Sequence, residues 1–97
     1  MITLRKISSL KPTVRLRKCA YVFRETGRLF AAGTLADRTY LNGLLDIILE
    51  TGLAEGSGGV GSYISEKQTK LNSIPDSEMV WFCNDIYYFL MNSLGVT

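Results

Sequence analysis

The stretch that decides the predicted fold is residues 37–66, which read DRTYLNGLLDIILETGLAEGSGGVGSYISE. Five apolar residues of its first half share one helical face: Leu41, Leu44, Leu45, Ile48 and Leu49. Asp37 is a suitable N-cap for this helix, and Gly52 is a suitable terminus because glycine readily adopts the backbone that ends a helix. We therefore predict an amphipathic helix over residues 37–51.

The second half of the stretch predicts a small β-hairpin. Leu53–Glu55 and Tyr63–Ser65 are short apolar segments on either side of a glycine-rich tip. The tip, residues 56–61, also matches the G-x-G-x-x-G pattern of dinucleotide-binding loops. That pattern binds a pyrophosphate only between a strand and a helix of a βαβ unit, and this context is missing. The glycines are therefore interpreted as a hairpin tip.

Charge divides the chain into two unequal halves. Residues 1–40 contain nine Lys and Arg against two acids, a net charge of +7, whereas residues 41–97 contain two Lys against seven acids, a net charge of −5. The whole chain therefore carries only +2. This asymmetry predicts that the N-terminal half faces a polyanion, or that the two halves attract each other across an interface.

Residues 14–35 allow two interpretations. Apolar residues at three- and four-residue spacing within Val14–Glu25 favour a helix that Thr13 caps and Gly27 ends. Residues 28–33 would then form one or two further turns. The alternative is a β-hairpin with its turn at residues 25–28, because Tyr21 and its neighbours are common in strands.

Residues 75–95 predict a final helix that starts near Pro75 and is apolar nearly all round. Such a helix must be buried on more than one side, and in a small domain the second side is often another subunit. We therefore predict a homodimer. Its interface would use five residues of this helix: Trp81, Ile86, Tyr87, Phe89 and Leu90.

Several classes of function are disfavoured by composition. The chain has no histidine, the commonest general base, and its two cysteines lie far apart at positions 19 and 83. We therefore expect no enzyme, no metal site and no cofactor. Asn84 and Asp85 interrupt the longest apolar run, so no membrane span is expected. The prediction is a cytoplasmic protein, although residues 1–24, basic and free of acids, also read as a mitochondrial leader.

The helix and the segment that follows it resemble winged-helix repressors of the multiple-antibiotic-resistance regulator type. Residues 35–55, LADRTYLNGLLDIILETGLAE, are similar to their recognition helix, and Tyr63–Lys67 is similar to the return strand of their wing, with Gln68 where the family has glycine. The resemblance covers about residues 14–72. It implies a mostly helical α+β domain: a basic arm (1–12), a winged-helix core (13–72) and a C-terminal helix (75–95). The alternative fold keeps the C-terminal helices and places a β-hairpin at the N-terminus.

The resemblance implies a small transcriptional regulator that reads the major groove of double-stranded DNA with helix 37–51 and a wing over residues 53–65. Seven residues would contact DNA, through bases or phosphates: Arg38, Thr39, Asn42, Arg15, Arg17, Lys18 and Arg28. Asp46, a carboxylate on the exposed face, argues against this. The alternative function is a small protein-binding inhibitor, such as an immunity or anti-defence protein of a mobile element, that blocks a single target protein through its basic half.

Overall fold

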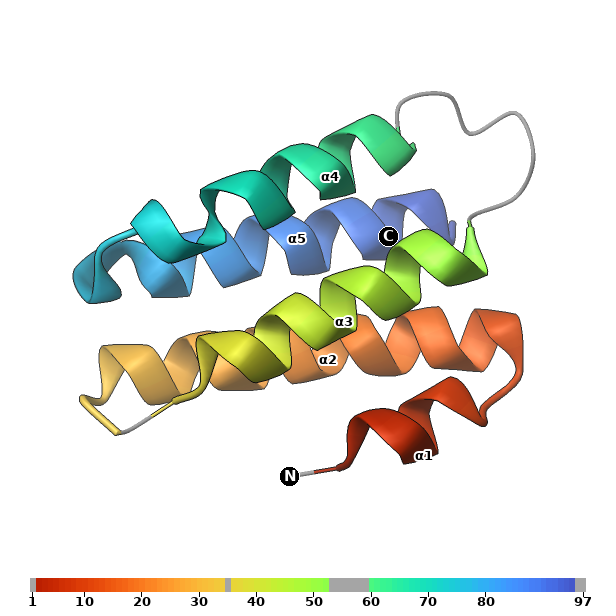
Figure 1. Ribbon diagram of the computed structural model, residues 1–97, viewed down its shortest axis with the longest axis horizontal. Helices are drawn as coiled ribbons and strands as arrows, with labels where there is room; N and C mark the ends of the chain where they lie inside the picture. Colours follow the sequence, from red (N-terminus) through yellow and green to blue (C-terminus); the bar gives the residue numbers. More distant parts are fainter. Residues whose placement is uncertain (1, 35, 53–59, 96–97) are drawn as a thin grey trace.

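The computed structural model describes residues 2–34, 36–52 and 60–95, and every regular element in these ranges is helical (Figure 1). The elements are α1 (Leu4–Ser8), α2 (Pro12–Ala31), α3 (Arg38–Thr51), α4 (Val60–Lys70), two short 3-10 helices (Leu71–Ser73 and Asp76–Glu78) and α5 (Met79–Ser93).

The predicted α+β fold is wrong in both of its forms. Residues 63–65, expected to be the return strand of the wing, lie inside α4, and residues 14–31 form a helix rather than a β-hairpin. The other expected strand, residues 53–55, lies outside the described residues. The physical reason is periodicity: Ile64 and Leu71 are buried seven residues apart, which is the spacing of one helical face and not of a strand. The prediction of a winged-helix fold is therefore wrong.

Helix α2 confirms the helical interpretation of residues 14–25 but corrects both of its ends. It begins at Pro12, whose fixed φ suits the first helical position, so Thr13 is inside the helix and not its cap. It passes through Gly27 and ends after Ala31, so residues 28–31 are its last turn and not a separate segment. A Cβ on Gly27 would lie 2.9 Å from the Cβ of Cys83. Gly27 is therefore the point at which α2 and α5 approach each other closely.

Helix α3 has the predicted form. The side chain of Asp37 accepts a hydrogen bond from the backbone N–H of Thr39 at 2.8 Å, as an N-cap does. The helix ends at Gly52, which has a φ of 68°. Four residues of the predicted stripe are buried and Leu49 is partly buried. The predicted amphipathic helix is confirmed.

The helices pack around one core, with α2 and α5 running antiparallel side by side (Figure 1). Helix α3 crosses α2, α4 lies along α3 and beside α5, and α1 covers the α2–α3 side. Residues 1–12, expected to be an arm, contain α1, whose Ile7 is fully buried. The hydroxyl of Tyr40 also donates to the backbone carbonyl of Ile2, which attaches the N-terminal segment to α3.

Among the residues that the structure describes, no helix combines the length and the apolar character needed to cross a membrane.

Candidate interaction face

Exposed and half-buried aromatic and arginine side chains lie on the outer surfaces of α2 and α5, which pack side by side. We call this group the α2–α5 face and define it by six residues: Tyr21, Arg24 and Arg28 of α2, and Trp81, Tyr87 and Tyr88 of α5. Trp81 is 67% exposed and Tyr88 is 62% exposed, which is unusual for such large rings. Tyr21 adds a third ring at 36%. Exposed aromatic side chains of this kind make these two helices the candidate site for association.

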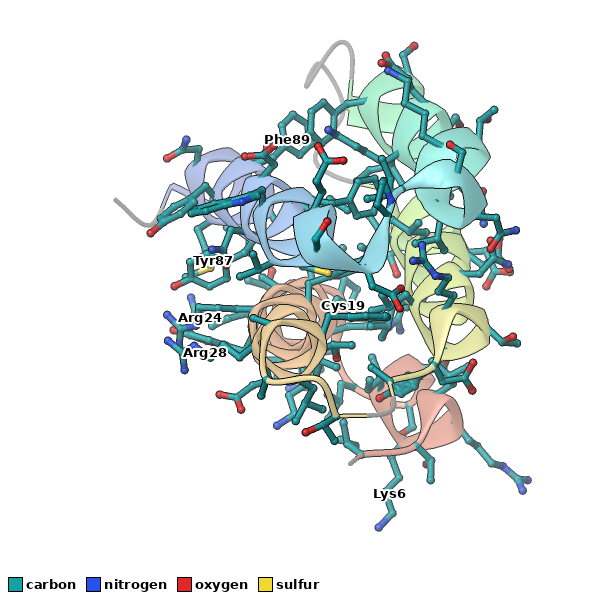
Figure 2. The ribbon with its side chains drawn as sticks, turned by 90° about the vertical axis from the view of Figure 1, so that its left-hand side faces the viewer. Lys6, Cys19, Arg24, Arg28, Tyr87 and Phe89 are labelled. Carbon is teal, nitrogen blue, oxygen red and sulfur yellow. The ribbon has the colours of Figure 1, made fainter. Side chains whose placement is uncertain are left out.

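Helical geometry explains why these residues share a face. Tyr21, Arg24 and Arg28 are three and four residues apart, so they form one row along α2 beside α5. Trp81 and Tyr88 are two turns apart on α5. The small Gly27 lets the two helices approach, which brings the Arg24 row against the Tyr87 side of α5. Figure 2 shows Arg24, Arg28 and Tyr87 projecting on the same side of the molecule, away from Lys6.

Arg24 lies at the centre of the face and is held by two tyrosines. Its guanidinium carbon is 4.6 Å from the ring centroid of Tyr87 and 5.2 Å from that of Tyr21, both within cation–π range. Its Nη1 also donates a hydrogen bond to the Tyr87 hydroxyl at 3.1 Å. Tyr88 then packs edge-on against Tyr87, with centroids 5.1 Å apart. These contacts within the chain fix the orientation of the Arg24 guanidinium.

The positive charge of this face is poorly compensated. Within the described part of the chain, no carboxylate lies within ion-pair distance of Arg24, and its Nε is buried without a hydrogen-bond partner. Arg28 has only a loose contact with Glu25, 3.8 Å long between two side chains that are more than 60% exposed. Such a contact contributes little. Arg24 and Arg28 therefore carry little counter-charge among the described residues.

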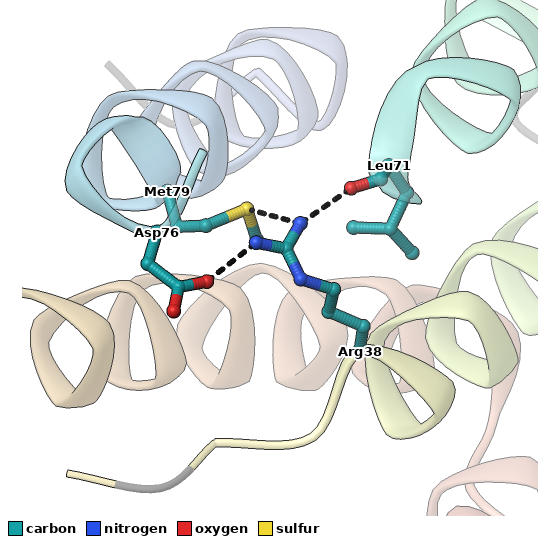
Figure 3. Close-up of polar contacts among 4 residues, drawn as sticks. All are labelled: Arg38, Leu71, Asp76 and Met79. Carbon is teal, nitrogen blue, oxygen red and sulfur yellow. Dashed lines mark hydrogen bonds and ion pairs between the residues drawn. The ribbon is translucent and has the colours of Figure 1, made fainter. Parts of the chain in front are cut away.

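Arg38, expected to contact DNA, is directed into the protein instead (Figure 3). Its Nη1 donates to the carbonyl oxygen of Leu71 at 2.6 Å and approaches the Met79 sulfur at 3.3 Å. Its Nη2 pairs with Asp76 at 2.6 Å. The guanidinium also lies over the ring of Phe30, 5.4 Å from the centroid. Arg38 thus joins α3 to the segment between α4 and α5.

Arg15 is also used inside the protein. Its guanidinium donates to the carbonyl oxygen of Leu10 through two nitrogens and to the hydroxyl of Thr51 at 2.8 Å. It therefore ties the start of α2 to the segment after α1 and to the end of α3. The other three basic residues proposed for DNA contact, Arg17, Lys18 and Arg28, are exposed on α2.

The predicted base-reading residues Thr39 and Asn42 are exposed on α3, but neighbouring elements border them. A Cβ on Gly43, the next residue, would collide with the side chain of Leu4 from α1. On the other side, the Gln68 amide of α4 donates to the Asp46 carboxylate at 2.7 Å. Because α1 and α4 flank it, α3 does not stand out from the surface as a helix that enters the major groove does. DNA reading by α3 stays a prediction.

The five residues proposed for a dimer interface divide into two groups. Ile86 and Leu90 are fully buried in the chain's own core, and Phe89 stacks on Tyr63 of α4 with ring centroids 3.8 Å apart. Only Trp81 and Tyr87 belong to the α2–α5 face. Sequence reasoning missed Tyr21, Arg24 and Tyr88 as site residues. The row of Tyr21, Arg24 and Arg28 on the outer side of α2 was the available signal.

Both cysteines are buried. Burial raises the pKa of the Cys19 and Cys83 thiols to about 12, opposed only in part by the charges of Arg15 and Arg38 respectively, so neither is a nucleophile near neutral pH. No group of three or more Cys, Asp or Glu side chains in the described ranges is arranged to hold a metal ion. A hollow of about 570 Å³ at the end of α2 contains one charged pair, and its members, Arg38 and Asp76, neutralise each other.

Comparisons with protein-family models, with curated proteins and with solved structures found no match to this chain.

Proposed function

We propose that this chain is a protein-binding module that attaches, one to one, to an acidic surface of another protein through its α2–α5 face and thereby blocks that surface. The observation that carries the proposal is the exposure of Trp81 and Tyr88 on α5, where Tyr88 packs on the Tyr87 ring that holds Arg24. Trp, Tyr and Arg are the residue types that dominate the energy of protein interfaces. The proposal keeps the inhibitor function suggested by the sequence but places only part of the binding surface, the α2 residues, in the basic half of the chain.

The size of the face suits such a partner. The six residues span about 10 Å along each helix, and two neighbouring helices give a width of about 20 Å. An interface of standard size, roughly 800 Å² for each protein, would extend from this centre along α2, whose 20 residues are about 30 Å long. The rings and the guanidinium would form its centre, and exposed polar residues its rim.

Charge favours a protein partner of opposite sign over a second copy of this chain. Two copies docked through the same face would bring Arg24 and Arg28 of one copy close to those of the other, and like charges repel. A nucleic acid is less favoured because two of the four rings, Tyr21 and Tyr87, already pack on the Arg24 guanidinium and are not free to stack on bases. The crosslinking experiment described next would reveal either a second copy of the chain or a nucleic acid as the bound molecule.

Site-specific photo-crosslinking in the native host tests the proposal. A photoreactive phenylalanine analogue placed at position 88 should yield one dominant protein adduct, whereas the same group at Thr69 of α4 should not. The partner protein identified in this adduct, purified on its own, should then bind the wild-type chain at a ratio of 1:1 in calorimetry. Truncation of Trp81 and Tyr88 to alanine should weaken this binding by at least 100-fold, since hot-spot residues each contribute about 2 kcal/mol or more.

A charge-matched control separates specific docking from general attraction. Lys6→Gln removes one positive charge from α1, outside the α2–α5 face, so it should change the affinity less than twofold. The proposal fails if the position-88 adduct is nucleic acid or a second copy of the chain. It also fails if the purified protein binds the Trp81→Ala/Tyr88→Ala variant as tightly as the wild type.

A further inference from the structure

We infer that the docking surface continues from the α2–α5 face along α2 to Arg17 and Val14, and that the partner places acidic side chains over Arg17 and Arg28. This inference rests on the proposed function and specifies the charge pattern of its partner. A surface that includes Trp81 and Tyr88 has two directions in which to extend, along α2 or across α5 to α4. The charges on the two sides favour α2.

Arg17 continues the row of arginine and tyrosine side chains on the outer side of α2. It lies four residues before Tyr21 and eleven before Arg28, and both separations are close to whole helical turns, so the three side chains share one side of the helix. Val14, three residues before Arg17, adds an apolar side chain that is 51% exposed. Along the helix axis, Arg17 and Arg28 are about 16 Å apart.

This row runs antiparallel to α5, so its two ends lie beside opposite ends of that helix (Figure 1). Gly27, near one end of the row, meets the first turns of α5. Tyr21 packs on Tyr87, further along α5, with ring centroids 5.8 Å apart. A partner that covers both exposed rings of α5, Trp81 and Tyr88, therefore spans much of the row.

The α2 side is positively charged and has little counter-charge. Arg17 is exposed and forms no ion pair within the described part of the chain. Glu25 is the only acid of α2, and its contact with Arg28 is loose. Exposed cations in such a row attract acidic side chains of a partner and guide its approach.

The α4 side has the opposite character. Lys70 already pairs with Glu66 at 2.7 Å, and Lys67 is half-buried with its ammonium 5.2 Å from the centroid of the Tyr63 ring. Asp85, on the adjoining part of α5, is exposed and forms no ion pair among the described residues. An acidic partner would meet like charge there, which is unfavourable. The charges therefore direct the partner along α2.

Photo-crosslinking from the row tests this direction. The photoreactive phenylalanine analogue placed at Val14 should form an adduct with the same protein as the analogue at position 88. At Thr69 of α4 it should not. The absence of this adduct from Val14, or its presence at Thr69, would overturn the extension along α2 and leave the α2–α5 face standing.

Association kinetics with the protein identified at position 88, purified and measured by surface plasmon resonance, test the two arginines. Charges near the edge of an interface act mainly on the association rate and on its dependence on salt. Arg17→Gln and Arg28→Gln should therefore each slow association at least threefold at low salt and should change dissociation less than twofold. Arg5→Gln is the matched control, because it makes the same change at an exposed arginine of α1, and it should alter neither rate by more than 1.5-fold.

The outcomes distinguish this inference from the proposed function. If Arg17→Gln associates as fast as Arg5→Gln, the acidic contact at Arg17 is overturned, while weak binding of Trp81→Ala/Tyr88→Ala would still support the face. If position 88 yields no protein adduct, the proposed function itself fails. Thermal unfolding followed by circular dichroism verifies that each variant is folded.

Discussion

Replacing Arg38 by methionine should destabilise the protein by about 2 kcal/mol without altering the α2–α5 face. Methionine keeps most of the apolar stem over Phe30, so the substitution removes mainly the polar contacts of the guanidinium. The hydrogen bond from a charged group to the Leu71 carbonyl contributes roughly 1.5–3 kcal/mol. The ion pair with Asp76, whose side chain is 77% exposed, contributes at most about 1 kcal/mol.

Urea unfolding followed by circular dichroism measures this effect. With a slope typical of a small domain, between about 1 and 2 kcal/mol per molar urea, the midpoint should fall by about 1–2 M. The thermal midpoint should fall by about 8–16 °C for a chain of this length. Asp76→Asn, which removes only the exposed carboxylate charge, is the matched control and should cost about 0.5 kcal/mol or less. Arg38→Lys should lie between the two because an ammonium cannot reach both acceptors in the same geometry.

A midpoint for Arg38→Met within about 0.3 M of wild type would refute the structural role of Arg38. Equal losses in Arg38→Met and Asp76→Asn would show that the surface ion pair, and not the Leu71 contact, carries the effect. The result also bears on the predicted DNA contact. If Arg38 holds the fold together, any loss of DNA binding in an Arg38 variant reports unfolding, and Asn42 is the better residue for that test.

Further predictions concern packing and the buried thiols. Gly27→Val should destabilise by roughly 1–3 kcal/mol in the same urea assay, because the new side chain meets the Cβ of Cys83, which cannot rotate away. Gly43→Ala should cost less than about 1 kcal/mol, since the atom in its way is the flexible end of Leu4 and alanine favours the helix. Cys19 and Cys83 should resist an aromatic disulfide reagent at pH 8, followed by absorbance, until urea unfolds the chain. The pKa of both thiols is about 12 in the folded chain and near 9 in the unfolded chain. The stability that the protonated thiols contribute should therefore be fully present below pH 9 and should fall as the pH rises toward 12. Urea midpoints measured across that range check this.

Local pattern was enough to predict α3, because every signal for that helix lies within it. Asp37 caps the helix through its own neighbour Thr39, the apolar stripe repeats at helical spacing, and Gly52 supplies the backbone that ends it. The predicted strand at residues 63–65 failed for a related reason. Three residues are too few to show a period, and the burial of Ile64 and Leu71 on one helical face emerges only when residues 60–71 are taken together.

The candidate face was only partly foreseeable. The sequence singled out Trp81 and Tyr87 as contact residues and Arg28 as a free cation, but it also assigned the buried Ile86 and Leu90 to an interface. A helix that is apolar nearly all round indicates burial on several sides without indicating what covers each side. Here α2 covers one side and Tyr63 of α4 covers another, which leaves Trp81 and Tyr88 exposed.

By itself, the sequence determined that residues 37–51 and much of 75–95 are helices and that the basic charge lies in the N-terminal half, because periodicity, caps and composition are local properties. For residues 14–25 it favoured a helix but left a β-hairpin open. Only the tertiary structure decided which arginines are free. Arg15 and Arg38 are engaged by carbonyl groups 5 and 33 residues away, whereas Arg24 meets Tyr87, 63 residues away, and still lacks a counter-charge among the described residues. Pairings over such separations depend on how the helices cross, and no local spacing contains that information.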